Sequence, residues 1–146
     1  MEFTFDVYAK IQRPVAEVFD AVYNPSKLSG YFTTGGATAP LDVGAAVMWD
    51  FADFPGAFPV HVREMVPNER IVLEWQAGDG DYLTRVTMTF EPLDPSRTLV
   101  RINEGKWRET PEGLRSSYGN CSGWMHMLCC LKLYVERGLN LREGFF

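Results

Sequence analysis

Apolar and polar residues alternate along residues 3–11, so that positions 3, 5, 7, 9 and 11 are all apolar. A period of two places successive side chains on opposite faces of an extended chain. The sequence is therefore predicted to begin with a half-buried strand.

Helical spacing replaces this alternation after residue 13. Four apolar residues recur at intervals of three or four: Val15, Val18, Phe19 and Val22. This is the period of an amphipathic helix. Pro14 suits its first turn and Pro25 ends it, because the residue before a proline avoids helical angles. A second short helix is predicted over 26–29, and the stretch 30–44, with its glycines and proline, is predicted to be a loop.

Five more alternating stretches follow, with turns between them. Strands are predicted over residues 43–51, 58–66, 70–76, 82–91 and 97–107, with 52–58 as a connection. Asp79-Gly80 is typical of a hairpin turn. Because successive hairpins produce antiparallel strands, we expect one curved antiparallel sheet of about six strands.

The last periodic segment is a long helix that follows Thr110, a good N-cap, and has Pro111 in its first turn. It ends before Gly138, a typical C-terminal stop. Gly119 and Gly123 predict a kink or a restart in its middle. One long helix must bury its apolar side against one face of the sheet, so the predicted fold class is α+β. Residues 1–146 are expected to form one domain.

The apolar side of this helix, drawn at about 100° per residue, carries Cys121, Trp124, Met125, Leu128, Leu131 and Val135. His126 and Cys130 fall on the opposite side, and Cys129 points away from both. Zinc needs about four converging ligands, and no CxxC or HExxH pattern occurs. We therefore predict no metal site and no cofactor, and we assign the cysteines to packing. The segment is then either a plain core helix or the wall of an apolar ligand cavity.

The composition of the chain limits the classes of function that it can have. The net charge is −5 and no cluster of basic residues is longer than two, which excludes a nucleic-acid footprint. No apolar run approaches the roughly 20 residues of a membrane span. Three cysteines in one segment are typical of a reducing compartment, and the first ten residues lack signal-peptide features, so a cytoplasmic location is expected. An aromatic content of 14% suits a thick core or the lining of a ligand cavity.

Three stretches then give the chain a family resemblance: "RPVAEVFDAV" near the start, Gly123-Trp124, and "LKLYVERG" from Leu131 to Gly138. Together with the order of elements they resemble the SRPBCC/START-like superfamily, and within it the branch related to the C-terminal domain of the heat-shock ATPase activator. The resemblance implies a helix-grip fold, in which a curved sheet wraps around the C-terminal helix. It also implies an apolar cavity for a lipid, a polyketide or another hydrophobic molecule. Members of the superfamily differ in activity, so the fold does not fix the function.

The inward face of such a sheet and the facing helix supply the expected ligand-binding residues. They are Trp49, Phe51, Val62, Leu73, Trp75, Val86, Met88, Ile102, Glu104, Trp124 and Leu128, with Tyr31 and Phe32 as a cap and Trp107 and Tyr118 completing the wall.

Glu104 is the polar residue of this set and a weak candidate for catalysis. It shares the inward side of Val100 and Ile102, although a bulge at Gly105 would turn it outward. An acid at a strand end is expected to be solvated. If Glu104 were buried, desolvation would raise its pKa, and it could anchor a ligand or exchange protons. Glu64 is expected in solvent for the same reason.

Three functions follow from these observations. The leading hypothesis is a binding module, rather than an enzyme, that accepts an apolar small molecule between sheet and helix. The second is a co-chaperone-like partner of a heat-shock ATPase that acts through its surface. The third is a cyclase- or hydrolase-type enzyme that uses a buried carboxylate, Glu104. A homodimer, formed through an edge strand or exposed aromatic residues, is compatible with each of them.

Overall fold

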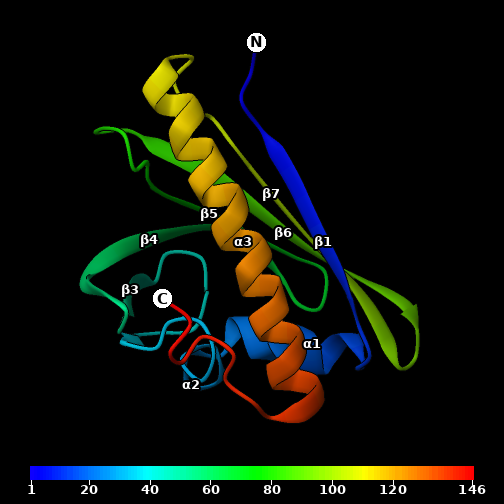
Figure 1. The fold of residues 1–146 in the computed structure, drawn as a ribbon. Coiled ribbons are helices and arrows are strands. Elements are labelled where there is room, and N and C mark those ends of the chain that lie inside the picture. The colour runs from blue at the N-terminus through cyan, green and yellow to red at the C-terminus, as the bar shows by residue number, and fades with distance from the viewer.

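A computed structural model describes residues 1–146. The chain forms one curved sheet with a long helix lying across its inner face (Figure 1). The elements are, in chain order, β1 (Phe5–Ile11), α1 (Val15–Tyr23), α2 (Pro25–Leu28), β2 (Gly36–Ala37), β3 (Ala46–Phe51), β4 (Phe54–Val66), β5 (Arg70–Gln76), β6 (Leu83–Asp94), β7 (Arg97–Gly105) and α3 (Pro111–Arg137). All neighbouring strands are antiparallel, in the order β1-β7-β6-β5-β4-β3-β2. The predicted α+β helix-grip class is confirmed.

The sheet has seven strands instead of about six, because the very short β2 pairs with the end of β3. Gly36 has a φ of +121°, which glycine adopts readily, and this lets two residues pair inside a stretch predicted to be loop. β4 already begins at Phe54, not at residue 58 as predicted. Phe54 pairs directly with Phe51, so the connection between β3 and β4 is only a tight turn at residues 52–53.

α3 is one uninterrupted helix of 27 residues, so the helix does not restart at Gly119 and Gly123, one of the two outcomes predicted there. Its ends are as predicted. The Thr110 hydroxyl accepts a hydrogen bond from the Gly113 backbone N–H at 3.0 Å, and Gly138 ends the helix with a φ of 69°. The cap and the well-packed second half of α3 hold the helix together across its two central glycines. Neither α3 nor any other helix combines the length and apolar character needed to cross a membrane.

The buried side of α3 differs from the predicted apolar side of the helix. Three of the six residues on that predicted side are buried: Trp124, Leu128 and Leu131. Met127 and Cys130 are also fully buried, whereas Met125 is 40% exposed. The loop after α2 causes the displacement, because Tyr31 stacks on Tyr134 at 5.0 Å and covers a second side of the helix. The helix is therefore enclosed by the sheet and by this loop together.

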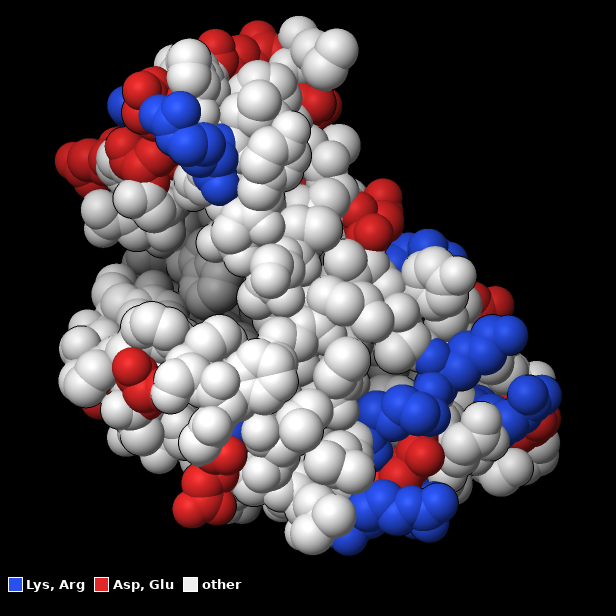
Figure 2. All heavy atoms as spheres, in the orientation of Figure 1, with Lys and Arg blue, Asp and Glu red and all other residues white.

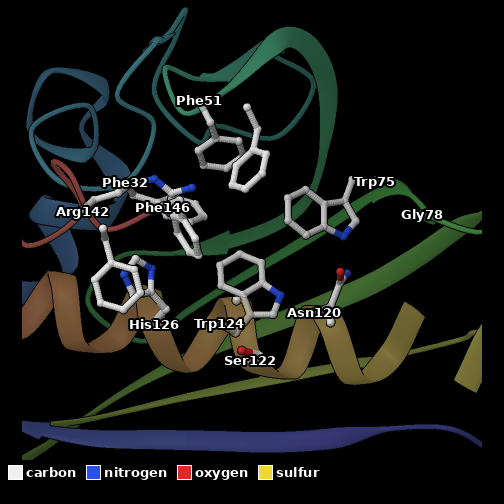
Figure 3. Close-up of a pocket in the computed structure, with 14 residues that line it drawn as sticks. Phe32, Phe51, Trp75, Gly78, Asn120, Ser122, Trp124, His126, Arg142 and Phe146 are labelled. Atoms are coloured by element: carbon white, nitrogen blue, oxygen red, sulfur yellow. The ribbon is translucent and has the colours of Figure 1, made fainter. Parts of the chain in front are cut away.

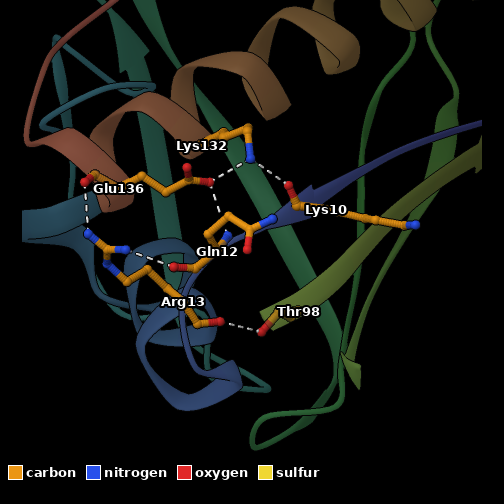
Figure 4. Close-up of polar contacts among 6 residues, drawn as sticks. All are labelled: Lys10, Gln12, Arg13, Thr98, Lys132 and Glu136. Carbon is orange, nitrogen blue, oxygen red and sulfur yellow. Dashed lines mark hydrogen bonds and ion pairs between the residues drawn. The ribbon is translucent and has the colours of Figure 1, made fainter. Parts of the chain in front are cut away.

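Polar contacts fasten the end of α3 to the end of β1 (Figure 4). The Glu136 carboxylate accepts hydrogen bonds from the Gln12 backbone N–H at 3.0 Å and from Lys132 Nζ at 2.6 Å. Lys132 Nζ also donates to the Lys10 carbonyl oxygen at 2.8 Å. Arg13 donates to the backbone oxygen of Glu136 at 2.8 Å. This clamp fixes the C-terminal half of α3 on the sheet, while its N-terminal half extends past the loop after α2.

Candidate functional site

A cleft of about 780 Å³ opens between the middle of α3 and the half of the sheet that contains β3, β4 and β5. Figure 2 shows it as a deep hollow whose visible inner surface carries no charged residues. Its walls come from four parts of the chain: the loop after α2, strands β3 to β5 with their turns, α3, and the C-terminal segment. The cleft therefore lies where the helix-grip architecture was expected to leave space between helix and sheet.

A continuous aromatic wall forms one side of the cleft (Figure 3). The ring centroids of Phe32 and Trp124 lie 5.6 Å apart, and those of Trp124 and Trp75 lie 5.3 Å apart. Phe51 meets the edge of Phe32 at 5.0 Å. These four residues were among the expected ligand-binding residues. The contacts between them hold each ring in place, so the wall is already formed without a ligand.

Glu104 lies directly behind this wall and is fully buried. Trp75 Nε1 donates to Oε2 at 2.9 Å, and Trp124 Nε1 donates to Oε1 at 2.8 Å. Thr84 Oγ1 donates to Oε2 at 2.7 Å, and Asn120 Nδ2 lies 3.1 and 3.0 Å from Oε1 and Oε2. The expectation of a solvated acid is therefore wrong, because side chains from β5, β6 and α3 surround the carboxylate.

The regular pairing of β6 and β7 places the Glu104 side chain on the inner face of the sheet. Val86 pairs with Glu104 and Arg85 with Gly105, so no bulge interrupts the strand here. Burial raises the pKa of Glu104 above its ordinary value, although the hydrogen bonds from the indoles, Thr84 and Asn120 act in the opposite direction. No lysine, arginine or histidine pairs with this carboxylate. Neutral donors occupy both of its oxygens, so its evident role is to orient the two tryptophans.

Glu64, the other acid with inward parity, behaves as expected. A register shift between Val62 and Glu64 turns the strand. The Glu64 carboxylate is 43% exposed and accepts a hydrogen bond from Arg70 at 2.7 Å. It contributes nothing to the cleft.

The C-terminal segment closes one end of the cleft through Arg142. Arg142 Nε donates to Asp53 Oδ1 at 3.1 Å, and a second guanidinium nitrogen lies 3.0 Å from Oδ2. The guanidinium carbon lies 4.6 Å from the centre of the Phe51 ring, a cation–π geometry. The Arg142 side chain is only 8% exposed. It therefore anchors the C-terminal segment to the turn between β3 and β4.

Two phenylalanines beyond this anchor form the rim of the cleft. The Phe145 ring lies 4.1 Å from that of His126, and Phe146 lies 5.4 Å from Phe54. Burial lowers the pKa of His126 below its ordinary value, and nearby Arg142 acts in the same direction, so the imidazole is mainly neutral near pH 7. Sequence patterns gave no signal for this rim, because these residues belong to no periodic element.

Besides Trp124 and His126, α3 contributes small and polar residues to the cleft that were not among the expected ligand-binding residues: Gly119, Asn120, Ser122 and Gly123. Gly78, in the turn after β5, faces the same space. The sequence pattern marks Gly119 and Gly123 as helix-weakening residues, and Gly123 also as part of the family resemblance. Their spacing of four residues next to Trp124 was the available signal, because it places both on one side of a helix.

The remaining expected ligand-binding residues lie elsewhere. Eight are buried in the hydrophobic core beside the cleft: Tyr31, Trp49, Val62, Leu73, Val86, Met88, Ile102 and Leu128. Trp107 packs against Phe5, with ring centroids 5.6 Å apart. Tyr118 is 65% exposed on the outer side of α3. Side chains thus fill most of the interior of the fold, and the open space is limited to one end.

The histidine–cysteine pair on α3 does not form a reactive site. His126 Nε2 lies 3.6 Å from Cys130 Sγ. Burial raises the pKa of Cys130 to about 11, so its thiol stays protonated at neutral pH. No three histidine, cysteine, aspartate or glutamate side chains come together as metal ligands.

Comparison with known proteins agrees with this architecture. Residues 12–136 match the family described as Activator of Hsp90 ATPase homolog 1-like protein, whereas no curated protein matches the sequence. Protein SSP2350 from Staphylococcus saprophyticus has a TM-score of 0.77 at 23% identity, over 94% of this chain and 96% of that chain. The Aha1 dimer from Colwellia psychrerythraea has a TM-score of 0.77 at 19% identity, over 93% of this chain and 98% of that chain.

A third similar structure, DynU16, is a putative protein in the dynemicin biosynthetic locus. Its TM-score is 0.78 at 25% identity, over 92% of this chain and 48% of that chain. The family match extends over most of the sequence, from the end of β1 to the end of α3. This chain therefore belongs to the Activator of Hsp90 ATPase homolog 1-like protein family.

Proposed function

We propose that the chain is a binding module that accepts an apolar small molecule in the aromatic cleft. The observation that carries the proposal is an open cleft lined by the partly exposed rings of Phe51 and Trp75. Phe32 and Trp124, which are almost fully buried, pack against these two rings. A volume of about 780 Å³ lies within the range of roughly 300–1,000 Å³ typical of small-molecule sites. Apolar contact supplies the affinity, and the few polar groups of the cleft orient the ligand.

One similar structure supports a natural product as the ligand. DynU16 is encoded in a biosynthetic locus, where proteins meet small organic molecules. Binding without turnover is the activity favoured by the geometry of the cleft. Both oxygens of the one buried acid, Glu104, are occupied by protein donors, and no thiol or metal-ligand cluster faces the cleft.

Thermal unfolding tests this proposal. Purified protein is melted alone and with 1-anilinonaphthalene-8-sulfonate, palmitate or 2-naphthol. A ligand that binds only the folded state stabilises it by about 2.7 kcal/mol at a concentration of 100 Kd, so at least one compound should raise the melting temperature by several degrees.

Phe51→Ala, which removes a ring from the wall, should reduce the shift. Trp107→Phe, which alters a buried residue outside the cleft, should retain it. Unchanged melting temperatures with all three compounds would rule out the proposal.

A second candidate function, a chaperone partner, is favoured by the family description alone. We infer that such a partner would contact the surface of the chain and would not need the cleft. The test is the ATP hydrolysis rate of a purified Hsp90-type ATPase with and without the chain. An unchanged rate at saturating concentrations would dismiss this candidate and would leave the binding module unaffected.

A further inference from the structure

Two glycines, which have no side chains, lie on the part of α3 that lines the cleft. Gly119 and Gly123 are one helical turn apart, and His126 continues the same row. Apart from proline, glycine is the least favourable residue in a helix interior. Two of them in one helix therefore call for a physical reason.

The protein itself supplies no such reason. A Cβ atom built at Gly119 or at Gly123 would meet no atom within 4 Å beyond its chain neighbours and the adjacent helix backbone. By contrast, a Cβ atom at Gly113 would come 2.0 Å from the Arg108 carbonyl oxygen, so glycine is required there by the fold. Neither central glycine has a positive φ, so conformation does not require it either. Both glycines are exposed, and their bare backbone forms part of the lining of the cleft.

Asn120, between the two glycines, provides a polar group of defined orientation. Its Nδ2 donates to the buried Glu104 carboxylate. A carboxylate only accepts hydrogen bonds, so the nitrogen of the amide must face Glu104 and the oxygen must point away from it. Its Oδ1 has no hydrogen-bond partner in the protein and is not among the buried polar atoms that lack one, so it remains accessible. The site thus combines a strip of bare backbone, an aromatic wall and an unpaired hydrogen-bond acceptor, Asn120 Oδ1, beside the polar side chains of Ser122 and His126.

We propose that Gly119 and Gly123 are ligand-contact positions and that the cleft selects a planar aromatic molecule that carries a hydroxyl group. One face of the ring lies on the bare backbone of α3, the remaining surface meets Trp75 and Trp124, and the hydroxyl donates to Asn120 Oδ1. A rigid flat face makes the most van der Waals contacts with a strip from which side chains are missing. This inference rests on the proposed function and specifies its ligand.

Isothermal titration calorimetry of the whole chain tests the ligand class with three probes. They are 2-naphthol, its saturated analogue decahydro-2-naphthol, and 2-methoxynaphthalene, which lacks the donor. We expect 2-naphthol to bind at least tenfold more tightly than either of the others. Equal affinities for 2-naphthol and the saturated analogue, or no binding of 2-naphthol, would overturn the inference.

Alanine substitutions test the glycine positions. The double variant Gly119→Ala/Gly123→Ala should have a higher melting temperature than the wild type, because alanine favours the helix and meets no steric conflict. Its affinity for 2-naphthol should nevertheless fall at least tenfold. Cys129→Ala is the matched control, since this residue lies on an exposed part of α3 outside the cleft, and it should leave the affinity unchanged.

The result that would overturn the role of the glycines is a more stable double variant that binds 2-naphthol as tightly as the wild type. A double variant that is less stable would also overturn it, because the space at these positions would then not be free. Failure of the proposed function is a different result, namely the absence of any thermal shift with the other two compounds as well as with 2-naphthol.

Discussion

At the scale of single residues, the cleft depends most on Glu104, which holds Trp75 and Trp124 through their indole N–H groups. A glutamine has one acceptor oxygen and one NH₂ group. In Glu104→Gln the NH₂ group would therefore face one of the N–H or O–H donors that now bind the carboxylate. We expect this variant to lose about 2 kcal/mol of unfolding free energy at pH 7, measured by urea denaturation. Glu64→Gln, which changes an exposed acid, should cost less than about 1 kcal/mol.

The difference in unfolding free energy between wild type and Glu104→Gln should also depend on pH. Because burial raises the folded-state pKa of Glu104, the stability contributed by its protonation is fully present below the unfolded value near 4.5. This contribution is lost as the pH rises through the raised pKa. The stability advantage of wild type over Glu104→Gln should therefore be largest near pH 4.5 and should shrink as the pH increases. An advantage that grows over this interval would contradict the assignment.

Sequence parity correctly placed Glu104 on the inward side of β7, next to Val100 and Ile102. Its burial could not be predicted from its own neighbourhood, because its donors belong to three other elements. An acid at the end of a strand is normally solvated. Only the three-dimensional arrangement shows that α3 covers this end of β7 and supplies Asn120 and Trp124.

Arg142 is the second residue with a clear prediction, because it joins the C-terminal segment to Asp53 in a largely buried ion pair. Arg142→Met leaves the Asp53 carboxylate without its partner and should cost about 2 kcal/mol in urea denaturation. Adding Asp53→Asn should recover part of this loss, because the unpaired charge is removed. If the two changes were simply additive, the pair would not be coupled.

At the scale of elements, α3 shows what helical spacing reveals and what it leaves out. Helical spacing alone predicts that Trp124, Leu128 and Leu131 lie on the buried side, and all three are buried. Met127 and Cys130 were missed because the loop after α2 covers a second side of the helix, and a loop leaves no periodic signal. The caps at Thr110 and Gly138 were predictable, since each acts through its own local chemistry.

The clamp at the end of α3 carries the prediction that belongs to this scale. Burial, the largest single influence, acts to raise the pKa of Glu136, but hydrogen bonds from Lys132 and from the Gln12 backbone outweigh it, so the pKa is lowered. Its stabilising effect should therefore be present above pH 4.5 and be lost as the pH falls through the lowered pKa. Glu136→Gln should cost about 1 kcal/mol at pH 7 in urea denaturation.

Lys132→Met provides the control for this clamp. Its effect and that of Glu136→Gln should be less than additive in the double variant, because both remove the same contact. Full additivity would show that Lys132 and Glu136 stabilise the chain separately.

At the scale of the whole molecule, the alternation of strands, the two short helices and the long final helix were enough to predict a curved antiparallel sheet that encloses α3. The location of the open space was not predictable in the same way. Strand parity selects every inward side chain, but it does not show which of them fill the interior. The rim formed by the C-terminal segment is decisive here, because it places Arg142, Phe145 and Phe146 around space that the sheet alone leaves open.

The indole N–H signals of the protein provide the most direct test of the central claim, that a small molecule occupies this space. The chain has four tryptophans, and two of them donate to Glu104 while the Nε1 atoms of Trp49 and Trp107 have no partner. In ¹H–¹⁵N spectra, saturating 2-naphthol should shift the signals of Trp75 and Trp124 and leave that of Trp107 in place. Four unchanged signals, or a shift of Trp107 as large as those of Trp75 and Trp124, would contradict ligand binding in the aromatic cleft.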